Sequence, residues 1–240
     1  MKKLILPFII IAIIVISACT KKEVSDALNT VSNNGITDSQ IVQGLIAALN
    51  TGTDSSTTQT HRTDGYFKNS LIKIPFPQDA QSILDVISYI PGGQSYVDNV
   101  VLSLNRAAEQ AAIKAEPIFL NAITSITITD GKNILFGDSL AATNYLNSKT
   151  YSSLKTAFLP DIKTSLDNVS ATSYWSTLTG LYNQVPLVKP VNTDLPDYAT
   201  GKALDGLFIM VGQEEKKIRK DPAARISDIL KTVFGQLDKH

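Results

Sequence analysis

Cysteine and histidine are scarce in this chain of 240 residues, which has one cysteine, Cys19, and two histidines, His61 and His240. A single cysteine excludes an internal disulfide, and its place near the N-terminus does not suit a catalytic thiol. The sequence lacks the motifs of zinc proteases, EF-hands, nucleophile elbows and glycine-rich phosphate loops. We therefore expect no metal site, no cofactor and no conventional Ser-His-Asp site.

An excess of charge is also missing, because 22 Lys and Arg residues balance 22 Asp and Glu residues. Surfaces that bind nucleic acid or anionic membranes carry clustered positive charge, whereas the charges here are scattered. We therefore expect no nucleic-acid partner. Apolar residues make up 43% of the chain, which is enough for the sizeable core of a globular domain.

The N-terminal segment has the pattern of a bacterial lipoprotein signal peptide. Two lysines at 2–3 precede an apolar run at 4–15, and Ile16-Ser17-Ala18 leads into Cys19. The apolar run is shorter than the ~20 residues that a membrane-spanning helix needs. An uncleaved anchor and a plain secretory signal remain the alternatives. We expect cleavage of residues 1–18 and attachment to the membrane by acyl chains on Cys19.

The residues after the cleavage site indicate where the protein resides. Thr20 follows the cysteine in place of the aspartate that retains many such proteins at the inner membrane. We therefore expect a cell-envelope protein, lipid-anchored in the outer membrane and facing the periplasm. Residues 19–37 are polar and form the expected tether, and 38–240 form the expected single domain.

Apolar residues at helical spacing run through most of 38–240 and predict an all-α domain of roughly nine or ten helices. The clearest stripe, within 97–115, is rich in alanine in its second half, which allows a close helix neighbour. Expected N-caps are Asp38, Asp130, Asp138, Asp197 and Asp221. The expected helices are 38–49, 77–90, 97–115, 116–126, 130–135, 138–146, 151–169 with a kink near Pro160, 174–185, 197–220 and 221–237.

Three segments depart from this helical pattern. The stretch 51–64 is almost entirely polar and is expected to be either a loop or the frayed end of the first helix. Residues 71–77 alternate apolar side chains but contain two prolines, which predicts an extended segment lying across helices. Residues 183–196 contain three prolines and are expected to form an irregular surface connection.

Several segments, in order and spacing, resemble the bacterial domain-of-unknown-function family 4197. The resemblance extends over about 36–235, and its matching segments are 103–112, 117–119, 141–143, 198–208, 214–219, 222–225 and 233–235. It implies an exported and often lipid-anchored protein, in agreement with the expectation for Cys19. It implies no activity and supplies no catalytic residues.

Charged residues on two helices form the most notable polar group. Arg106 and Glu109 are neighbours at i, i+3 beside the alanine-rich face. If the last helices pack there, a partly buried network with four C-terminal residues results: Glu214, Glu215, Arg219 and Arg225. Such a network could fix helix register, line a ligand or partner site, or perform acid–base chemistry. Glu214 and Glu215 diverge by ~100° on a helix, which disfavours a catalytic carboxylate pair.

A second candidate group comprises Tyr198, Lys202 and Asp205. Lys202 and Asp205 have the spacing of an exposed ion pair. Gly206 inside the same helix costs ~1 kcal/mol relative to alanine, which predicts a close neighbour.

Two functions are compatible with this sequence. The first is a non-enzymatic module that binds a protein, lipid or cell-wall component, and the second is a hydrolase or transferase with an unorthodox carboxylate or tyrosine site. We name no catalytic residue. The alanine-rich face or the last helix also offers a surface for a homodimer.

Overall fold

The computed structural model describes residues 35–87, 93–184, 186–191 and 193–239. Asp38–His240 forms one compact unit, distinct from residues 1–37. The expected signal peptide, Cys19 and most of the tether lie outside the described residues. Their predictions therefore stay predictions.

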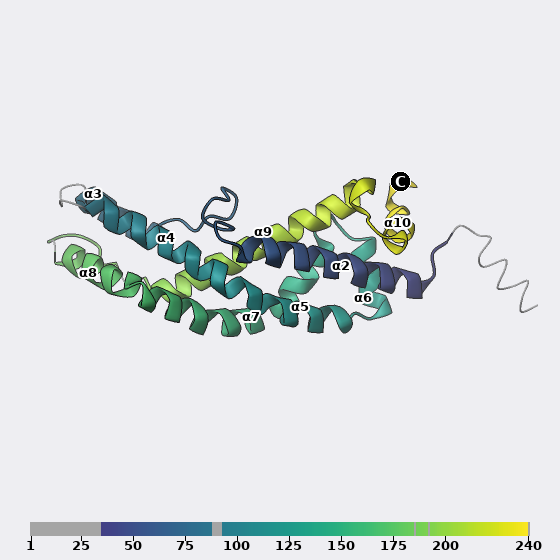
Figure 1. The fold of residues 1–240 in the computed structure, drawn as a ribbon, viewed down its shortest axis with the longest axis horizontal. Coiled ribbons are helices and arrows are strands. Elements are labelled where there is room, and N and C mark those ends of the chain that lie inside the picture. Colours follow the sequence, from purple (N-terminus) through teal and green to yellow (C-terminus); the bar gives the residue numbers. More distant parts are fainter. Residues whose placement is uncertain (1–34, 88–92, 185, 192, 240) are drawn as a thin grey trace, which may run out of the picture. The chain divides into compact units, whose positions relative to one another are not determined.

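The described residues contain α-helices and short 3-10 helices and no strand, so the predicted all-α class is confirmed (Figure 1). The α-helices are α2 (Asp38–His61), α3 (Gln81–Ile87), α4 (Gly93–Ala111), α5 (Ala115–Thr124), α6 (Ile128–Leu135), α7 (Ala141–Asn168), α8 (Ala171–Asn183), α9 (Leu195–Lys220) and α10 (Asp228–Phe234). The 3-10 helices are Gln78–Ala80, Ala112–Lys114, Pro222–Ala224 and Leu237–Lys239.

The core forms where α7 packs against α4 and α9, and where α2 packs against α9, α10 and α6. The alanines of α4, among them Ala107, Ala108 and Ala111, are fully buried and let α7 approach closely. Larger side chains fill the layer beside them, and the rings of Phe119 and Phe208 meet edge to face at 5.8 Å. The alanine-rich face is therefore used inside the domain and is not available to a second copy.

Most of the polar stretch 51–64 is neither a loop nor a frayed end, because α2 continues without interruption to His61, and only 62–64 belong to the turn that follows. Ser56, Thr57 and Thr60 are buried, and each hydroxyl donates to the carbonyl four residues earlier at 2.6–2.8 Å. A hydroxyl that is satisfied by its own helix can enter a core. Polarity alone therefore led to the wrong prediction here.

Two of the expected N-caps are one turn too late. Thr127, not Asp130, caps α6, and Asp194, not Asp197, caps α9. In both helices the predicted aspartate occupies the third helical position. The positive end of the helix dipole stabilises an acidic side chain at this position, as it does at the N-cap, so the sequence does not distinguish the two positions.

The helix boundaries in the C-terminal half differ from the prediction at two places. The expected helices 138–146 and 151–169 are one helix, α7, which passes through Pro160. After Pro222 a 3-10 turn intervenes, and α10 begins only at Asp228 with Ser227 as its cap. Ile226 is consequently exposed rather than part of the predicted apolar stripe.

Among the described helices, none is by itself long and apolar enough to cross a membrane. The segment Gly93–Thr124 taken with Ile128–Leu135 reaches that composition, but it bends by 109° at the break.

Candidate functional site

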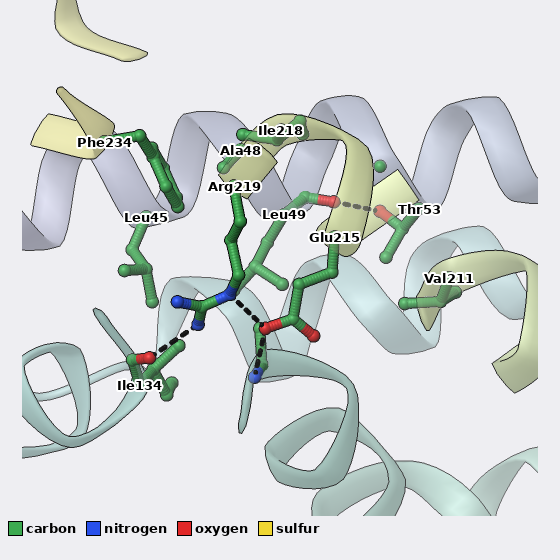
Figure 2. A pocket seen from close by; sticks show the side chains of 12 residues that line it. Leu45, Ala48, Leu49, Thr53, Ile134, Val211, Glu215, Ile218, Arg219 and Phe234 are labelled. Atoms are coloured by element: carbon green, nitrogen blue, oxygen red, sulfur yellow. Dashed lines mark hydrogen bonds and ion pairs between the residues drawn. The ribbon is translucent and has the colours of Figure 1, made fainter. Parts of the chain in front are cut away.

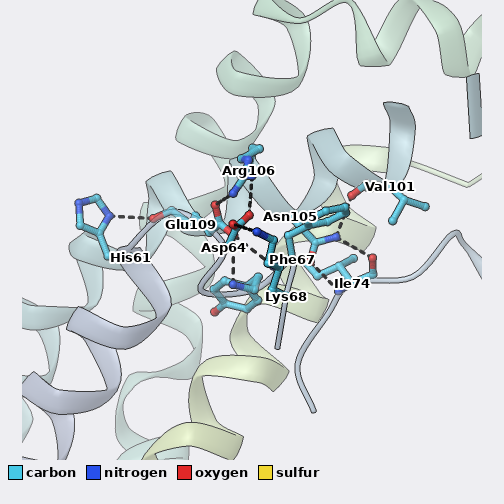
Figure 3. Close-up of polar contacts among 10 residues, drawn as sticks. His61, Asp64, Phe67, Lys68, Ile74, Val101, Asn105, Arg106 and Glu109 are labelled. Carbon is cyan, nitrogen blue, oxygen red and sulfur yellow. Dashed lines mark hydrogen bonds and ion pairs between the residues drawn. The ribbon is translucent and has the colours of Figure 1, made fainter. Parts of the chain in front are cut away.

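Glu109 organises a polar cluster on the last turns of α4 (Figure 3). One carboxylate oxygen accepts hydrogen bonds from the backbone N–H groups of Tyr66 and Phe67, both at 3.1 Å. The other accepts from Arg106 Nη1 at 2.6 Å. The side chain is almost fully buried, so these bonds replace the water that the carboxylate loses. Glu109 thus fixes the turn that follows α2 onto α4.

Arg106 extends this cluster to the surface. Its Nη2 lies 2.6 Å from Asp64, whose backbone is left-handed at φ 66° and whose carboxylate also pairs with Lys68 at 2.8 Å. Hydrogen bonds from Lys68 and Arg106 lower the pKa of Asp64, and those to Glu109 and Asp64 raise the pKa of Arg106. Two cations therefore balance two anions, and the cluster has no excess charge.

His61 and Tyr66 anchor the same turn through backbone carbonyls. His61 Nδ1 lies 2.8 Å from the carbonyl oxygen of Glu109, which can only accept, so this nitrogen carries the proton. The Tyr66 hydroxyl donates to the carbonyl of Ala203 at 2.7 Å. Burial, followed by the charge of Glu109, raises the pKa of Tyr66, so this phenol stays protonated. These two side chains thus hold the turn against α4 and α9.

Gly206 allows this tyrosine to reach α9. A Cβ at Gly206 would lie 2.7 Å from Tyr66 Cε1 and 3.1 Å from Ile72 Cβ. The predicted close approach at this glycine is confirmed.

Glu215 forms the centre of a second buried cluster (Figure 2). Its carboxylate accepts from the backbone N–H groups of Ala142 and Thr143 at 3.0 and 2.8 Å, and from the Thr143 hydroxyl at 2.7 Å. These N–H groups belong to the first turn of α7, which has no side-chain cap of its own. Glu215 therefore caps α7 from a distant helix, where the dipole favours a negative charge.

Arg219, one turn further along α9, caps the C-terminal end of α6. It donates to the carbonyls of Ile134 and Leu135 at 2.6 and 3.0 Å, and to Glu215 at 2.9 Å. These carbonyls end α6, where the dipole favours a cation. A cavity of ≈20 Å³ lies beside this ion pair, and its other walls are mainly apolar, including Leu49 and Phe234.

Arg225 closes the C-terminal end of α9 in the same way. It donates to the carbonyls of Ile218 and Arg219 at 3.0 and 2.8 Å and pairs with Asp238. The hydrogen bonds that the guanidinium donates to Asp238 lower the pKa of Asp238 and raise the pKa of Arg225. Three buried charged side chains of the C-terminal region thus bind helix ends.

The single network expected from the sequence is therefore two separate clusters. Within the described residues, no hydrogen bond or ion pair joins the Arg106–Glu109 group to the Glu215–Arg219 group. Glu214 belongs to neither, since it contacts Gln59 at 3.4 Å and Lys217 at 3.8 Å near the surface. The last helices do not pack over Arg106 in the manner that the prediction required.

Asn105 is a buried polar residue that sequence reasoning missed. Its side-chain oxygen accepts from the N–H of Ile74, and its amide nitrogen donates to the carbonyl of Ile74 and of Val101, all at 2.7–2.8 Å. The side-chain amide thus satisfies both backbone groups of Ile74, as a neighbouring β-strand would do. Of the segment 71–77, which the sequence predicts to be extended, the first two residues belong to a turn and the rest is non-helical, with Ile72, Ile74 and Phe76 buried in alternation.

Tyr198, Lys202 and Asp205 do lie together, along one face of α9. The Tyr198 hydroxyl donates to the carbonyl of Pro75 at 3.1 Å, and Lys202 pairs with Asp205 at 3.4 Å. Burial, followed by the charge of Asp79, raises the pKa of Tyr198. All three predicted residues line a hollow of ≈380 Å³ between α9 and the extended segment.

A second surface hollow, of ≈470 Å³, lies between α4 and the junction of α7 and α8. Arg106 and Gln110 line one side, and Val169 and Tyr174 line the other. Over the residues that the structure covers, no group of three or more His, Cys, Asp and Glu side chains could hold a metal ion.

Fold and clusters together define an all-helical domain whose buried charges bind its own backbone. The chain belongs to the family of proteins of unknown function DUF4197, whose family model matches residues 35–235. The resemblance inferred from the sequence is thereby confirmed. Neither a curated protein nor a solved structure matches the chain.

Proposed function

We propose that this protein is a lipoprotein of the cell envelope whose helical domain binds a partner and performs no chemistry. Acyl chains on Cys19 anchor it in the outer membrane on the periplasmic side. The domain holds a protein, lipid or cell-wall component close to that membrane. The signal-peptide pattern before Cys19 supports the location, and the use of the buried acids supports the role.

The observation that carries the second part is that groups of the fold itself bind both buried carboxylates. Glu109 accepts from two backbone N–H groups and a guanidinium, and Glu215 accepts from two backbone N–H groups, a hydroxyl and a guanidinium. A general base needs a lone pair within reach of the proton that it removes. At Glu215, where each oxygen accepts two hydrogen bonds, proton transfer would first break bonds that hold the fold. Glu109 is almost fully buried, which keeps its remaining lone pair away from a substrate. These two carboxylates therefore stabilise the fold, and the partner is bound by residues on the surface of the domain.

The location is tested by the intact mass of the purified protein. Acyl groups are expected on Cys19, and Cys19→Ala is expected to release the protein from the membrane fraction. An unacylated protein that remains in the membrane fraction would overturn the anchor.

Recognition is tested by photo-crosslinking in intact cells. A photoreactive amino acid is placed at Gln110 in one hollow, at Lys202 in the other, and at the exposed Lys163 as control. We expect one specific envelope adduct from Gln110 or Lys202 and none from Lys163. The same adducts from all three positions, or none from either hollow, would contradict a partner site there.

A further inference from the structure

The outer face of α6 carries two large apolar side chains in solvent. Ile128 is 52% exposed and Phe136, directly after the helix, is 62% exposed. Together with Lys132 they follow the spacing i, i+4, i+8, so they form a stripe along one side of α6. We call these three residues the α6 stripe. Ile134, on the opposite side of α6, is buried, and Leu135 is buried beside the stripe.

The α6 stripe lies at the point where the domain begins. Lys132 Nζ lies 2.8 Å from a carboxylate oxygen of Asp38, the first residue of α2. A Cβ at Gly131 would lie 3.1 Å from Val42 Cγ2, so α6 rests on the first turns of α2. The stripe therefore lies beside Asp38, the first residue of the domain after the chain that leads back to Cys19.

Both ends of α6 are closed by protein groups. At the N-terminus Thr127 and Asp130 form a reciprocal capping box, and at the C-terminus Arg219 binds two carbonyls. Unpaired backbone groups are costly in an apolar phase, so satisfied ends allow a helix to enter the edge of a bilayer. The positive charge of Lys132 is matched by Asp38, which leaves apolar contact as the stripe's main interaction.

We propose that the α6 stripe is the face by which the domain rests on the lipid bilayer, with Ile128 and Phe136 inserted at the boundary between headgroups and acyl chains. This rests on the proposed lipid anchor. The chain from Cys19 to Asp38 can span at most about 65 Å, which keeps the bilayer within reach of the stripe. Anchoring raises the local concentration of lipid at this surface, so a weak apolar contact suffices.

The test uses the full-length acylated protein in phosphatidylcholine–phosphatidylethanolamine vesicles with brominated acyl chains. Phe136→Trp reports on the stripe, and Tyr174→Trp is the matched control. Tyr174 is 40% exposed on α8, at the other end of the domain from α6 (Figure 1). The native Trp175 is buried and gives a constant background.

We expect bromine to quench the tryptophan at 136 and not the one at 174, with no dependence on salt. Adding Ile128→Ser to the Phe136→Trp protein should lower the quenching at least about twofold, since one of the two inserted apolar side chains is lost. Equal quenching at both positions, or none at 136, in protein whose mass shows the acyl groups would overturn the bilayer contact alone. Protein without acyl groups on Cys19 would overturn the anchor, and the inference with it.

Discussion

Replacement of Glu215 by alanine tests whether this carboxylate joins α6, α7 and α9. Glu215→Ala removes the cap from the N–H groups of Ala142 and Thr143. It also leaves the guanidinium of Arg219 buried without a counter-ion, since that side chain is only 7% exposed. Both losses act on the folded state, so we expect a large fall in the free energy of unfolding.

The magnitude follows from the burial of the partner. Breaking a buried ion pair by removing one member costs about 3–5 kcal/mol, because the remaining charge is uncompensated. In a domain of this size, 1 kcal/mol shifts the melting temperature by roughly 2–4 °C, so Glu215→Ala should lower it by about 10 °C. Glu214→Ala is the matched control on the adjacent residue. Its ion pair with Lys217 is long, at 3.8 Å and near the surface, so we expect a loss of at most about 0.5 kcal/mol.

Urea unfolding followed by circular dichroism, on the chain from residue 20 onward, measures both variants. The double variant Glu215→Ala/Arg219→Met should lose less stability than the two single variants added together, because it removes both charges. Equal stability losses for Glu214→Ala and Glu215→Ala would refute the inferred role of Glu215. Strict additivity in the double variant would refute the coupling to Arg219.

Three further changes probe other parts of the domain. Asn105→Leu leaves the buried N–H of Ile74 unpaired, so urea unfolding should show a loss of about 2 kcal/mol, and hydrogen exchange should rise in residues 71–77. Gly206→Ala meets a tyrosine ring at 2.7 Å and should cost about 1–3 kcal/mol in the same assay, whereas Gly201→Ala, with no atom within 4 Å, should stabilise the helix by up to about 1 kcal/mol. Asp238 has its pKa lowered by its arginine partner, so its contribution is full above the unfolded pKa of about 3.9 and disappears as pH falls through the folded value. Asp238→Asn should therefore destabilise the protein at pH 7, and a difference from wild type that does not shrink as pH falls below about 4 would contradict this reasoning.

The sequence identified most helices of this domain because their apolar residues repeat every three or four positions. It placed the start of two helices one turn late, for a physical reason. Asp130 and Asp197 stand at the third helical position, where the helix dipole favours an acid as it does at the cap. Thr127 completes a capping box with Asp130, and this reciprocal pair is the local signal that could have corrected the first boundary.

The charged clusters were only half predictable, because their partners are backbone groups of distant segments. Periodicity marked Arg106 with Glu109 as neighbours, and the ion pair confirms that step. The other partners of Glu109 lie more than forty positions earlier, at the N–H groups of Tyr66 and Phe67. Every residue has such an N–H group, so nothing in the sequence marks these two. The same limit hid the role of Asn105.

The charged side chains of α9 and its C-terminal extension follow a common electrostatic rule that bears on function. Glu215 lies at the N-terminus of α7, whereas Arg219 and Arg225 lie at the C-termini of α6 and α9. Each sign matches the partial charge of the helix end that it meets. These groups already have partners within the fold. Their contacts with helix ends stabilise the fold, whereas Gln110 and Tyr198 line surface hollows and the apolar side chains of the α6 stripe are exposed, so these residues are the first to test for binding.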